Sequence, residues 1–172
     1  MATGSTGPRP GAAKSNRQTQ QDAARRFAWE IASIDVYLQE IRSYWARILG
    51  VTGPQWMILM AVKDLDQGEG ASVKAVSALL HVDPSFVTTN SKMLEKKGFL
   101  RRKTSREDAR VVLMSLTDKT SKHVAALETR QDELNEFIFA GLTDHELEAM
   151  VSRLATLKRR LEKARLRAAS EL

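Results

Sequence analysis

The sequence predicts a mainly α-helical protein that carries one small β-hairpin between long terminal helices. Apolar residues recur at helical spacing near both ends of the chain. Between them, three shorter segments each open with a capping residue, and two runs rich in β-branched or bulky side chains follow the third. At 172 residues, the chain is long enough to bury a core of its own.

The composition favours a polyanionic partner and excludes several kinds of site. The chain has 27 Lys and Arg against 21 Asp and Glu, a net charge of +6, which favours nucleic acid or an anionic membrane surface. It has no cysteine, which excludes disulfides, thiolate metal sites and cysteine nucleophiles. Its three histidines are scattered, so neither a metal site nor a cofactor is expected. No apolar run approaches the roughly 20 residues of a membrane span, so we expect a cytoplasmic protein without a membrane partner.

The N-terminal region divides into a tail and a long helix. Residues 1–20 are rich in glycine, proline and basic residues, and we predict a flexible basic tail there. Whether its basic side chains contact DNA stays open; they are Arg9, Lys14 and Arg17. In the predicted helix of residues 21–51, apolar residues follow alternating steps of four and three. This heptad seam consists of Phe27, Ile31, Ile34, Leu38, Ile41, Trp45 and Ile48.

The C-terminal region, residues 117–172, predicts two further helices. Residues 117–141 form the first, and a Thr143–Glu146 capping box opens the second, which also has apolar residues at helical spacing. Long terminal helices that flank a short middle favour a symmetric homodimer over an intramolecular bundle. We expect both terminal regions to form a dimerisation domain, with an interface that includes Phe27, Ile31, Ile34, Leu147, Leu154, Leu157 and Leu161.

Residues 52–116 predict a compact lobe of three helices and a hairpin. A Thr52–Gln55 capping box opens the first helix, Ser72 caps a short second helix, and Asp83 caps a third that Gly98 closes. The runs LRRKT and RVVLMSLT, separated by SREDA, predict two strands joined by a polar turn. Three helices followed by a hairpin is the order of a winged helix-turn-helix, a DNA-binding lobe, here with long N- and C-terminal dimerisation helices.

The third helix of the lobe, residues 84–97, has the properties of a recognition helix. At 100° per residue, Val87, Ser91 and Leu94 face inward with Asn90 beside them, whereas the opposite face carries short polar side chains and then lysines. Short polar groups near the start of such a helix read base edges, and lysines meet phosphates. Two alternatives stay open for Asn90 and Ser91: their side chains bond to nearby backbone carbonyls, or they tilt towards the DNA groove.

The hairpin has the properties of a DNA-binding wing. Residues 92–110 hold eight basic and three acidic residues, an excess of +5. We expect Arg106 at the tip to enter the minor groove and Asp108 to hold the guanidinium of Arg106 or Arg110 in a bidentate pair. The predicted DNA contacts are Ser72, Lys74, Ser85, Phe86, Thr88, Thr89, Asn90, Lys92, Lys96, Thr104, Arg106, Asp108 and Arg110.

A small-molecule pocket is expected where the long N-terminal helix meets the first helix of the lobe. Aromatic walls with one arginine suit a planar carboxylate. The candidate residues are Arg42, Tyr44, Trp45, Trp56 and Met60. The alternative is that Trp45 and Trp56 belong to the hydrophobic core.

The stretch MLEKKGFLRRKTSREDARVVLMSLT resembles the MarR family of bacterial winged-helix regulators, and the resemblance runs from about residue 25 to 166. It implies a homodimer with an interface of terminal helices, two recognition helices on one pseudo-palindromic operator, and repression relieved by a small, often anionic aromatic ligand. Thr120 departs from the family pattern, which usually has glycine shortly after the closing leucine-threonine, and this leaves the start of the following helix undefined. The lack of cysteine separates this chain from the thiol-oxidation branch of the family.

These observations predict a ligand-responsive homodimeric transcriptional regulator, a repressor that binds duplex DNA and is released by a small aromatic acid. One alternative is a constitutive architectural or weakly specific DNA-binding protein without an effector. Another is a protein–protein adaptor, for which we would expect a hydrophobic or acidic outward face on the third helix. An enzyme is not expected, because no nucleophile elbow, glycine-rich phosphate loop or metal-ligand spacing is present in the sequence.

Overall fold

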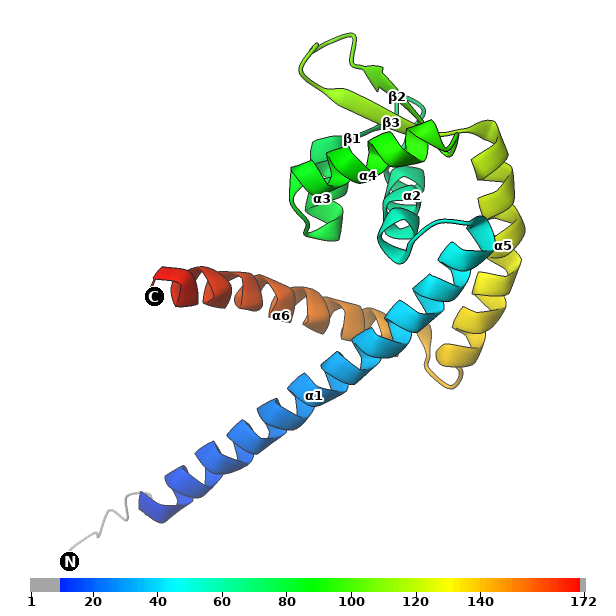
Figure 1. Cartoon of the computed structure of the whole chain (residues 1–172). Coiled ribbons are helices and arrows are strands. Elements are labelled where there is room, and N and C mark those ends of the chain that lie inside the picture. The colour runs from blue at the N-terminus through cyan, green and yellow to red at the C-terminus, as the bar shows by residue number, and fades with distance from the viewer. Residues whose placement is uncertain (1–9, 171–172) are drawn as a thin grey trace, which may run out of the picture. The chain divides into compact units, whose positions relative to one another are not determined.

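The computed structural model describes residues 10–170. The helices are α1 (Pro10–Leu49), α2 (Gly53–Leu65), α3 (Val73–Leu80), α4 (Pro84–Lys96), α5 (Asp118–Ile138) and α6 (Asp144–Ser170). The strands are β1 (Ala71–Ser72), β2 (Leu100–Thr104) and β3 (Val112–Leu116). The protein is therefore mainly helical with a small antiparallel sheet, which confirms the predicted fold class (Figure 1). It divides into two compact units, residues 1–123 and 124–172.

Helix α1 begins earlier than the sequence predicted. Residues 10–20 are helical, which corrects the flexible tail expected for residues 1–20; residues 1–9, with Arg9, lie outside the described part of the chain. This segment contains alanine, glutamine and basic residues with high helix propensity, and Pro10 suits a first helical position. Along the described helices α1–α6, no stretch is both long and apolar enough to cross a bilayer.

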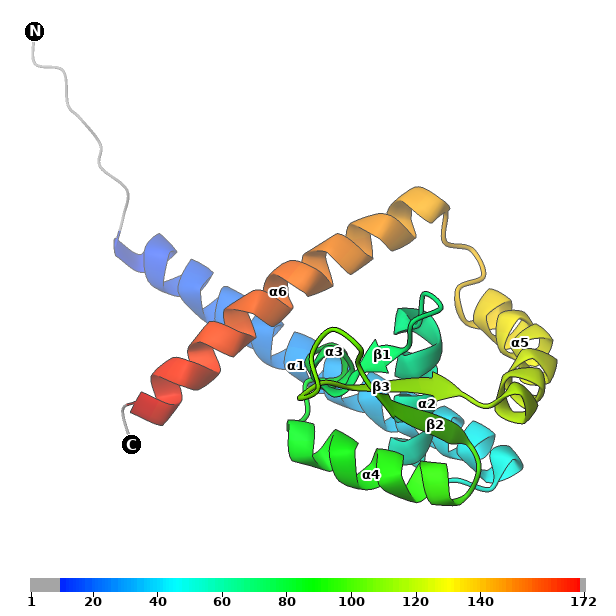
Figure 2. The same cartoon turned by 90° about the horizontal axis from the view of Figure 1, so that it is seen from above.

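The core of the first unit lies between α2, α3, α4 and the sheet, which gather together in both views (Figures 1 and 2). Each of these elements contributes side chains with no exposed surface. The fully buried set includes Ile58, Leu59, Val62, Val76, Val87, Leu94 and Met114. Burying each such aliphatic side chain stabilises the fold by about 1.5–3 kcal/mol. The orientation of α4 is therefore set by its inward stripe.

The predicted capping residues start the three helices of the lobe. At α2, the backbone N–H of Gln55 donates to Thr52 Oγ1 (3.4 Å) and that of Thr52 donates back to Gln55 Oε1 (3.3 Å). Ser72 accepts from the N–H of Ala75 at the start of α3. The tight turn between α3 and α4 contains His81 in the left-handed conformation, with φ of 54°.

The sheet contains the predicted hairpin and one additional short strand. Strands β2 and β3 pair from Leu100 with Leu116 to Thr104 with Val112, which confirms the hairpin. Strand β1, which was not predicted, pairs with the other edge of β3. Its approach requires Gly70 (φ +95°), because a Cβ at this position would lie 3.0 Å from Ser115 Oγ.

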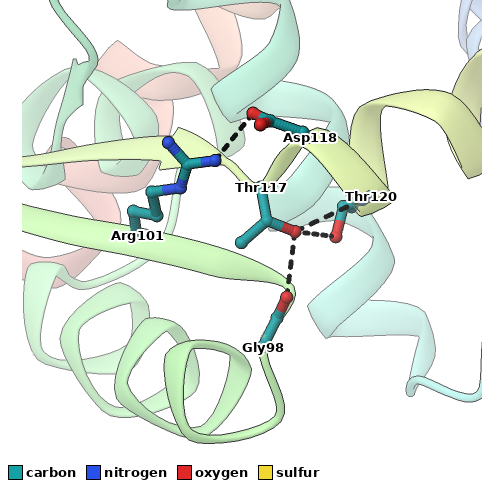
Figure 3. Close-up of polar contacts among 5 residues, drawn as sticks. All are labelled: Gly98, Arg101, Thr117, Asp118 and Thr120. Carbon is teal, nitrogen blue, oxygen red and sulfur yellow. Dashed lines mark hydrogen bonds and ion pairs between the residues drawn. The ribbon is translucent and has the colours of Figure 1, made fainter.

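A hydrogen-bonded junction begins α5 at the position where the sequence left its start undefined. Thr117 Oγ1 donates to the carbonyl oxygen of Gly98, which follows α4, at 2.9 Å. Thr117 Oγ1 also lies 2.8 Å from Thr120 Oγ1 and accepts from the backbone N–H of Thr120 (Figure 3). Thr120 is buried, so its hydroxyl and methyl group occupy space that a glycine would leave empty. The departure from the family pattern is therefore accommodated by local hydrogen bonds.

The second unit consists of most of α5 and all of α6. The predicted capping box opens α6: the N–H of Glu146 donates to Thr143 Oγ1 (3.3 Å), and the N–H of Thr143 donates to Glu146 Oε2 (2.9 Å). The Thr143 hydroxyl also donates to Glu146 Oε2 (2.8 Å), and the bonds from the backbone and hydroxyl of Thr143 to this carboxylate lower the pKa of Glu146. The helix then continues to Ser170 with several apolar side chains exposed.

Candidate nucleic-acid interface

Helix α4 presents the two faces that its sequence predicted. Val87, Ser91 and Leu94 have no exposed surface. The outward face is exposed and consists of Ser85, Thr89, Lys92 and Lys96. At the start of the helix, the side chain of Asp83 accepts from the N–H of Ser85 (2.7 Å), and hydrogen bonds from the Ser85 hydroxyl and backbone lower the pKa of Asp83.

The polar residues on the inner side of α4 bond within the helix. Asn90 Nδ2 donates to the carbonyl oxygen of Phe86 at 3.0 Å, and Ser91 Oγ donates to that of Thr88 at 3.1 Å. The sequence left open whether these two side chains bond to nearby carbonyls or tilt towards a DNA groove. The structure shows bonds to nearby carbonyls for both. Asn90 keeps its amide oxygen as an acceptor and is partly exposed, whereas Ser91 is fully buried.

The other residues of α3 and α4 that were predicted to contact DNA range from partly exposed to exposed. Phe86 and Met93 flank the outward face of α4 and are 39% and 44% exposed, and Thr88 is partly exposed. Lys74 is exposed on α3. The hydroxyl of Ser72 caps α3, so its role in the fold is structural.

Asp108 shapes the tip of the wing (residues 100–116) rather than holding a guanidinium. Its Oδ1 accepts from the backbone N–H of Arg110 at 2.8 Å, and its carbonyl oxygen accepts from the N–H of Val111 at 2.9 Å. The predicted bidentate pair is therefore wrong, because the carboxylate turns back onto the adjacent backbone in an Asx turn. Arg106 and Arg110 are exposed, and across residues 10–170 neither forms an ion pair.

Two arginines of the basic segment 92–110 form ion pairs within the protein, which the sequence interpretation missed. Arg101 Nη2 lies 2.6 Å from Asp118 Oδ1 at the start of α5 (Figure 3). Arg102 turns inward, with a side chain only 12% exposed, and its backbone N–H donates to Glu95 Oε1 of α4 at 3.0 Å. The period-two alternation of β2 contained this signal, because Arg102 shares a strand face with buried Leu100.

Apart from Lys74 on α3, the cations of the interface that remain without an ion pair in the described chain lie on α4, just after it, and on the wing. They are Lys92, Lys96, Lys97, Lys103, Arg106 and Arg110. Thr104 is exposed at the end of β2, beside the wing tip. The surface therefore combines short hydrogen-bonding groups on a helix with cations around it, as duplex DNA requires.

The sequence pattern of the MarR family matches residues 51–112. These residues are a MarR-family domain. The transcriptional regulator TtmR of Methylorubrum extorquens is 33% identical over 110 residues, 63% of this chain and 53% of TtmR. The chain thus spans about half the length of that relative. TtmR is named as a regulator and not as an enzyme.

Solved structures of other proteins share the fold of this chain at low sequence identity. The Staphylococcus aureus MepR–DNA complex superposes with a TM-score of 0.68 at 19% identity, covering 78% of this chain and 96% of MepR. CouR from Rhodococcus jostii RHA1, bound to p-coumaroyl-CoA, superposes with a TM-score of 0.67 at 19% identity, covering 76% and 90% of the two chains. At this identity the likeness establishes the winged-helix fold.

A cavity of about 360 Å³ lies where α1 meets the MarR domain, but only one predicted pocket residue lines it. Its lining residues are Gln39, Arg42, Ser43, Gly53, Pro54, Met57, Leu80, Val82 and Phe86. Arg42 is the residue that was predicted. The other lining residues were missed, because the sequence does not show which face of α2 meets α1.

The four other predicted pocket residues do not line this cavity. Trp45 and Trp56 are buried at 7% and 3% exposure, and Met60 packs against the core of the MarR domain. Tyr44 is half exposed and contacts the Trp45 ring edge-on, with 5.1 Å between ring centroids. The alternative assignment of both tryptophans to the core is therefore correct.

The predicted dimer-interface residues are apolar and largely uncovered in the single chain. Phe27, Ile31 and Ile34 on α1 are 46%, 38% and 51% exposed. On α6, Leu154 and Leu161 are 44% and 60% exposed, and Leu147 and Leu157 are partly exposed.

Proposed function

We propose that this protein is a DNA-binding transcriptional regulator that uses α4 and the wing to bind an operator in duplex DNA. The observation that carries the proposal is the outward face of α4, where Ser85 and Thr89 precede Lys92 and Lys96. Such a face offers hydrogen bonds to base edges at one end and charge to phosphates at the other. The exposed arginines at the wing tip, Arg106 and Arg110, extend the contact along the duplex. MepR, which shares the fold, is solved as a complex with DNA.

We further propose a homodimeric repressor that binds a pseudo-palindromic operator. The exposed apolar seams on α1 and α6 support this, because isolated helices rarely present such stripes to water. A two-fold dimer would place two α4 helices on successive major grooves, about 34–36 Å apart.

A small effector is proposed to act through the cavity beside α1. Phe86 both lines this cavity and flanks the outward face of α4, so a ligand there would touch the helix that reads DNA. A ligand that binds one position of α4 better than another changes DNA affinity by the difference in binding free energy. CouR, of the same fold, is solved with p-coumaroyl-CoA.

The test is selection of a preferred site from random duplexes, followed by titration against a scrambled duplex of equal length. A regulator should bind the selected site at least about a thousandfold more tightly than the scrambled one. Equal affinities would instead favour the architectural DNA-binding protein. No binding to either duplex in low salt would contradict a DNA-binding function.

A further inference from the structure

We propose that the cavity beside α1 selects uncharged planar compounds over aromatic acids, because Asp35 neutralises the arginine at its polar edge. The inference rests on the effector site proposed above and names the chemical class of its ligand. It differs from the sequence-based expectation of a planar carboxylate held by Arg42.

Gln39, Arg42 and Ser43 of α1 form the polar edge of the cavity, and Asp35 of the same helix bonds to two of them. Asp35 Oδ2 accepts from Gln39 Nε2 at 2.6 Å, and Asp35 Oδ1 accepts from Arg42 Nη2 at 3.2 Å. Asp35, Gln39 and Arg42 share one face of the helix because they are spaced by four and then three residues. Gln39 and Arg42 line the cavity, whereas Asp35 does not line it but bonds to both.

The charge on this edge is balanced before any ligand enters. The guanidinium of Arg42 contributes +1 and the carboxylate of Asp35 contributes −1 within one ion pair. A second carboxylate brought to Arg42 would lie close to Asp35, and like charges at short range repel. The cavity therefore lacks the unpaired cation that an aromatic acid needs.

The hydrogen-bonding groups left over on this edge match a neutral amide better than an acid. Because Nε2 of Gln39 is bound to Asp35, its Oε1 remains as an acceptor, and the Ser43 hydroxyl both donates and accepts. Arg42 keeps further N–H groups for a carbonyl oxygen. A carboxamide offers one acceptor and two donors to this set, whereas a carboxylate offers acceptors alone.

The rest of the cavity suits a flat apolar body. Its apolar lining includes Met57, Leu80, Val82 and Phe86. A volume of about 360 Å³ lies at the small end of the ligand-site range, which fits a compound of one or two rings.

The experiment compares matched neutral and charged ligands on the full chain. Cinnamamide and cinnamate, and 2-naphthamide and 2-naphthoate, are titrated by calorimetry at neutral pH into the wild type, Asp35→Asn and Glu40→Gln. The substitution Asp35→Asn keeps nearly the shape of the native side chain but removes its charge. Glu40 is the control, because its replacement gives the same change in net charge without breaking the ion pair between Asp35 and Arg42.

The wild type should bind each amide about threefold or more tightly than its acid. This preference corresponds to a free-energy difference of the size that an exposed ion pair contributes. Asp35→Asn should cancel or reverse this preference by strengthening acid binding, and Glu40→Gln should keep it. Tighter acid binding by the wild type, or an equal change in both variants, would overturn the selectivity but leave the effector site intact. No binding of any of the four compounds, alongside normal duplex binding, would refute the effector site and this inference with it.

Discussion

Thr117 and Thr120 share a hydrogen bond in which Thr120 is the donor. The Thr117 hydroxyl has one hydrogen, which it donates to the carbonyl oxygen of Gly98 at 2.9 Å, so Thr120 Oγ1 must donate across the 2.8 Å contact (Figure 3). Gly98, two residues after the end of α4, is thereby tied to the first turn of α5. This junction connects the end of α4 to the start of α5 through side chains rather than through the backbone alone.

Replacing Thr120 with valine should destabilise the protein by about 1 kcal/mol, because a buried hydrogen bond is lost while the shape is kept. Chemical denaturation monitored by circular dichroism measures this loss. Thr129→Val on the exposed side of α5 is the matched control and should change stability by less than about 0.5 kcal/mol. Equal effects of the two substitutions would show that the junction does not contribute.

Arg102→Ala should lower stability, whereas Arg106→Ala should weaken DNA binding. Arg102 packs inward against Glu95, so its loss should lower the unfolding midpoint. Arg106 is exposed at the wing tip, so its loss should weaken binding to every duplex and reduce the salt slope of log affinity by about 1, with stability unchanged. Fluorescence anisotropy at several salt concentrations and thermal denaturation give the two readouts. A stable Arg102→Ala protein with weakened DNA binding would reverse the assignment.

Thr89→Ala should change base preference at one position in each half-site, by about 1–3 kcal/mol for the preferred base pair. The reason is the exposed hydroxyl on the outward face of α4. Lys92→Ala on the same face serves as comparison and should weaken all sequences alike, because a lysine contacts phosphate. Titration of single-base operator variants distinguishes the two. A uniform loss for Thr89→Ala would argue against direct base readout.

Ile34→Glu should convert a dimer into monomers, because it places a charge in the apolar seam of α1, where Ile34 is 51% exposed in the single chain. Light scattering after size-exclusion chromatography measures the mass. Ser33→Glu, one residue outside the seam, should leave the mass unchanged. A wild type that is already monomeric at micromolar concentration would contradict the proposed dimer.

Asp66 should make stability depend on pH in the acidic range. Desolvation raises the pKa of Asp66, but hydrogen bonds from the N–H groups of Gly68 and Gly70, both 2.8 Å long, together with a hydrogen bond from Ser115 and the charge of Lys103, lower the pKa below the ordinary 3.8. A depressed folded-state pKa stabilises the fold above the unfolded-state value, and this stabilisation is lost as pH falls through the folded-state value. The stability difference between wild type and Asp66→Asn should therefore shrink below pH 3.8.

Denaturation midpoints measured from neutral pH down to strongly acidic buffer check this dependence on Asp66. Asp64→Asn, an exposed change two residues away, should track the wild type throughout. A wild-type advantage over Asp66→Asn that persists unchanged at the lowest pH would contradict the depressed pKa.

Much of the fold was predictable because its signals are local. The capping boxes Thr52–Gln55 and Thr143–Glu146 each join residues three apart, so a short stretch of sequence contains both partners. The inward stripe of α4 was also predictable, since helical periodicity alone places Val87 and Leu94 on one face.

The candidate site was predicted correctly where side-chain periodicity was used and incorrectly where only charges were counted. The outward polar face of α4 is as expected, but Asp108 bonds to its own turn and Arg102 turns inward. Counting charges missed both outcomes, although Asp108 bonds to the backbone only two residues ahead and the alternation of β2 places Arg102 on the face of buried Leu100.

The order of elements, the capped helices, the apolar seams and the basic character of the wing were determined by the amino-acid sequence alone, because each depends on residues close together in the chain. The tertiary structure decided that Arg42 lines a cavity with Phe86, that β1 joins the sheet beside β3, and that Thr117 links Gly98 to α5. These relationships join residues far apart in sequence, and packing of the core selects among the many pairings that local preferences allow.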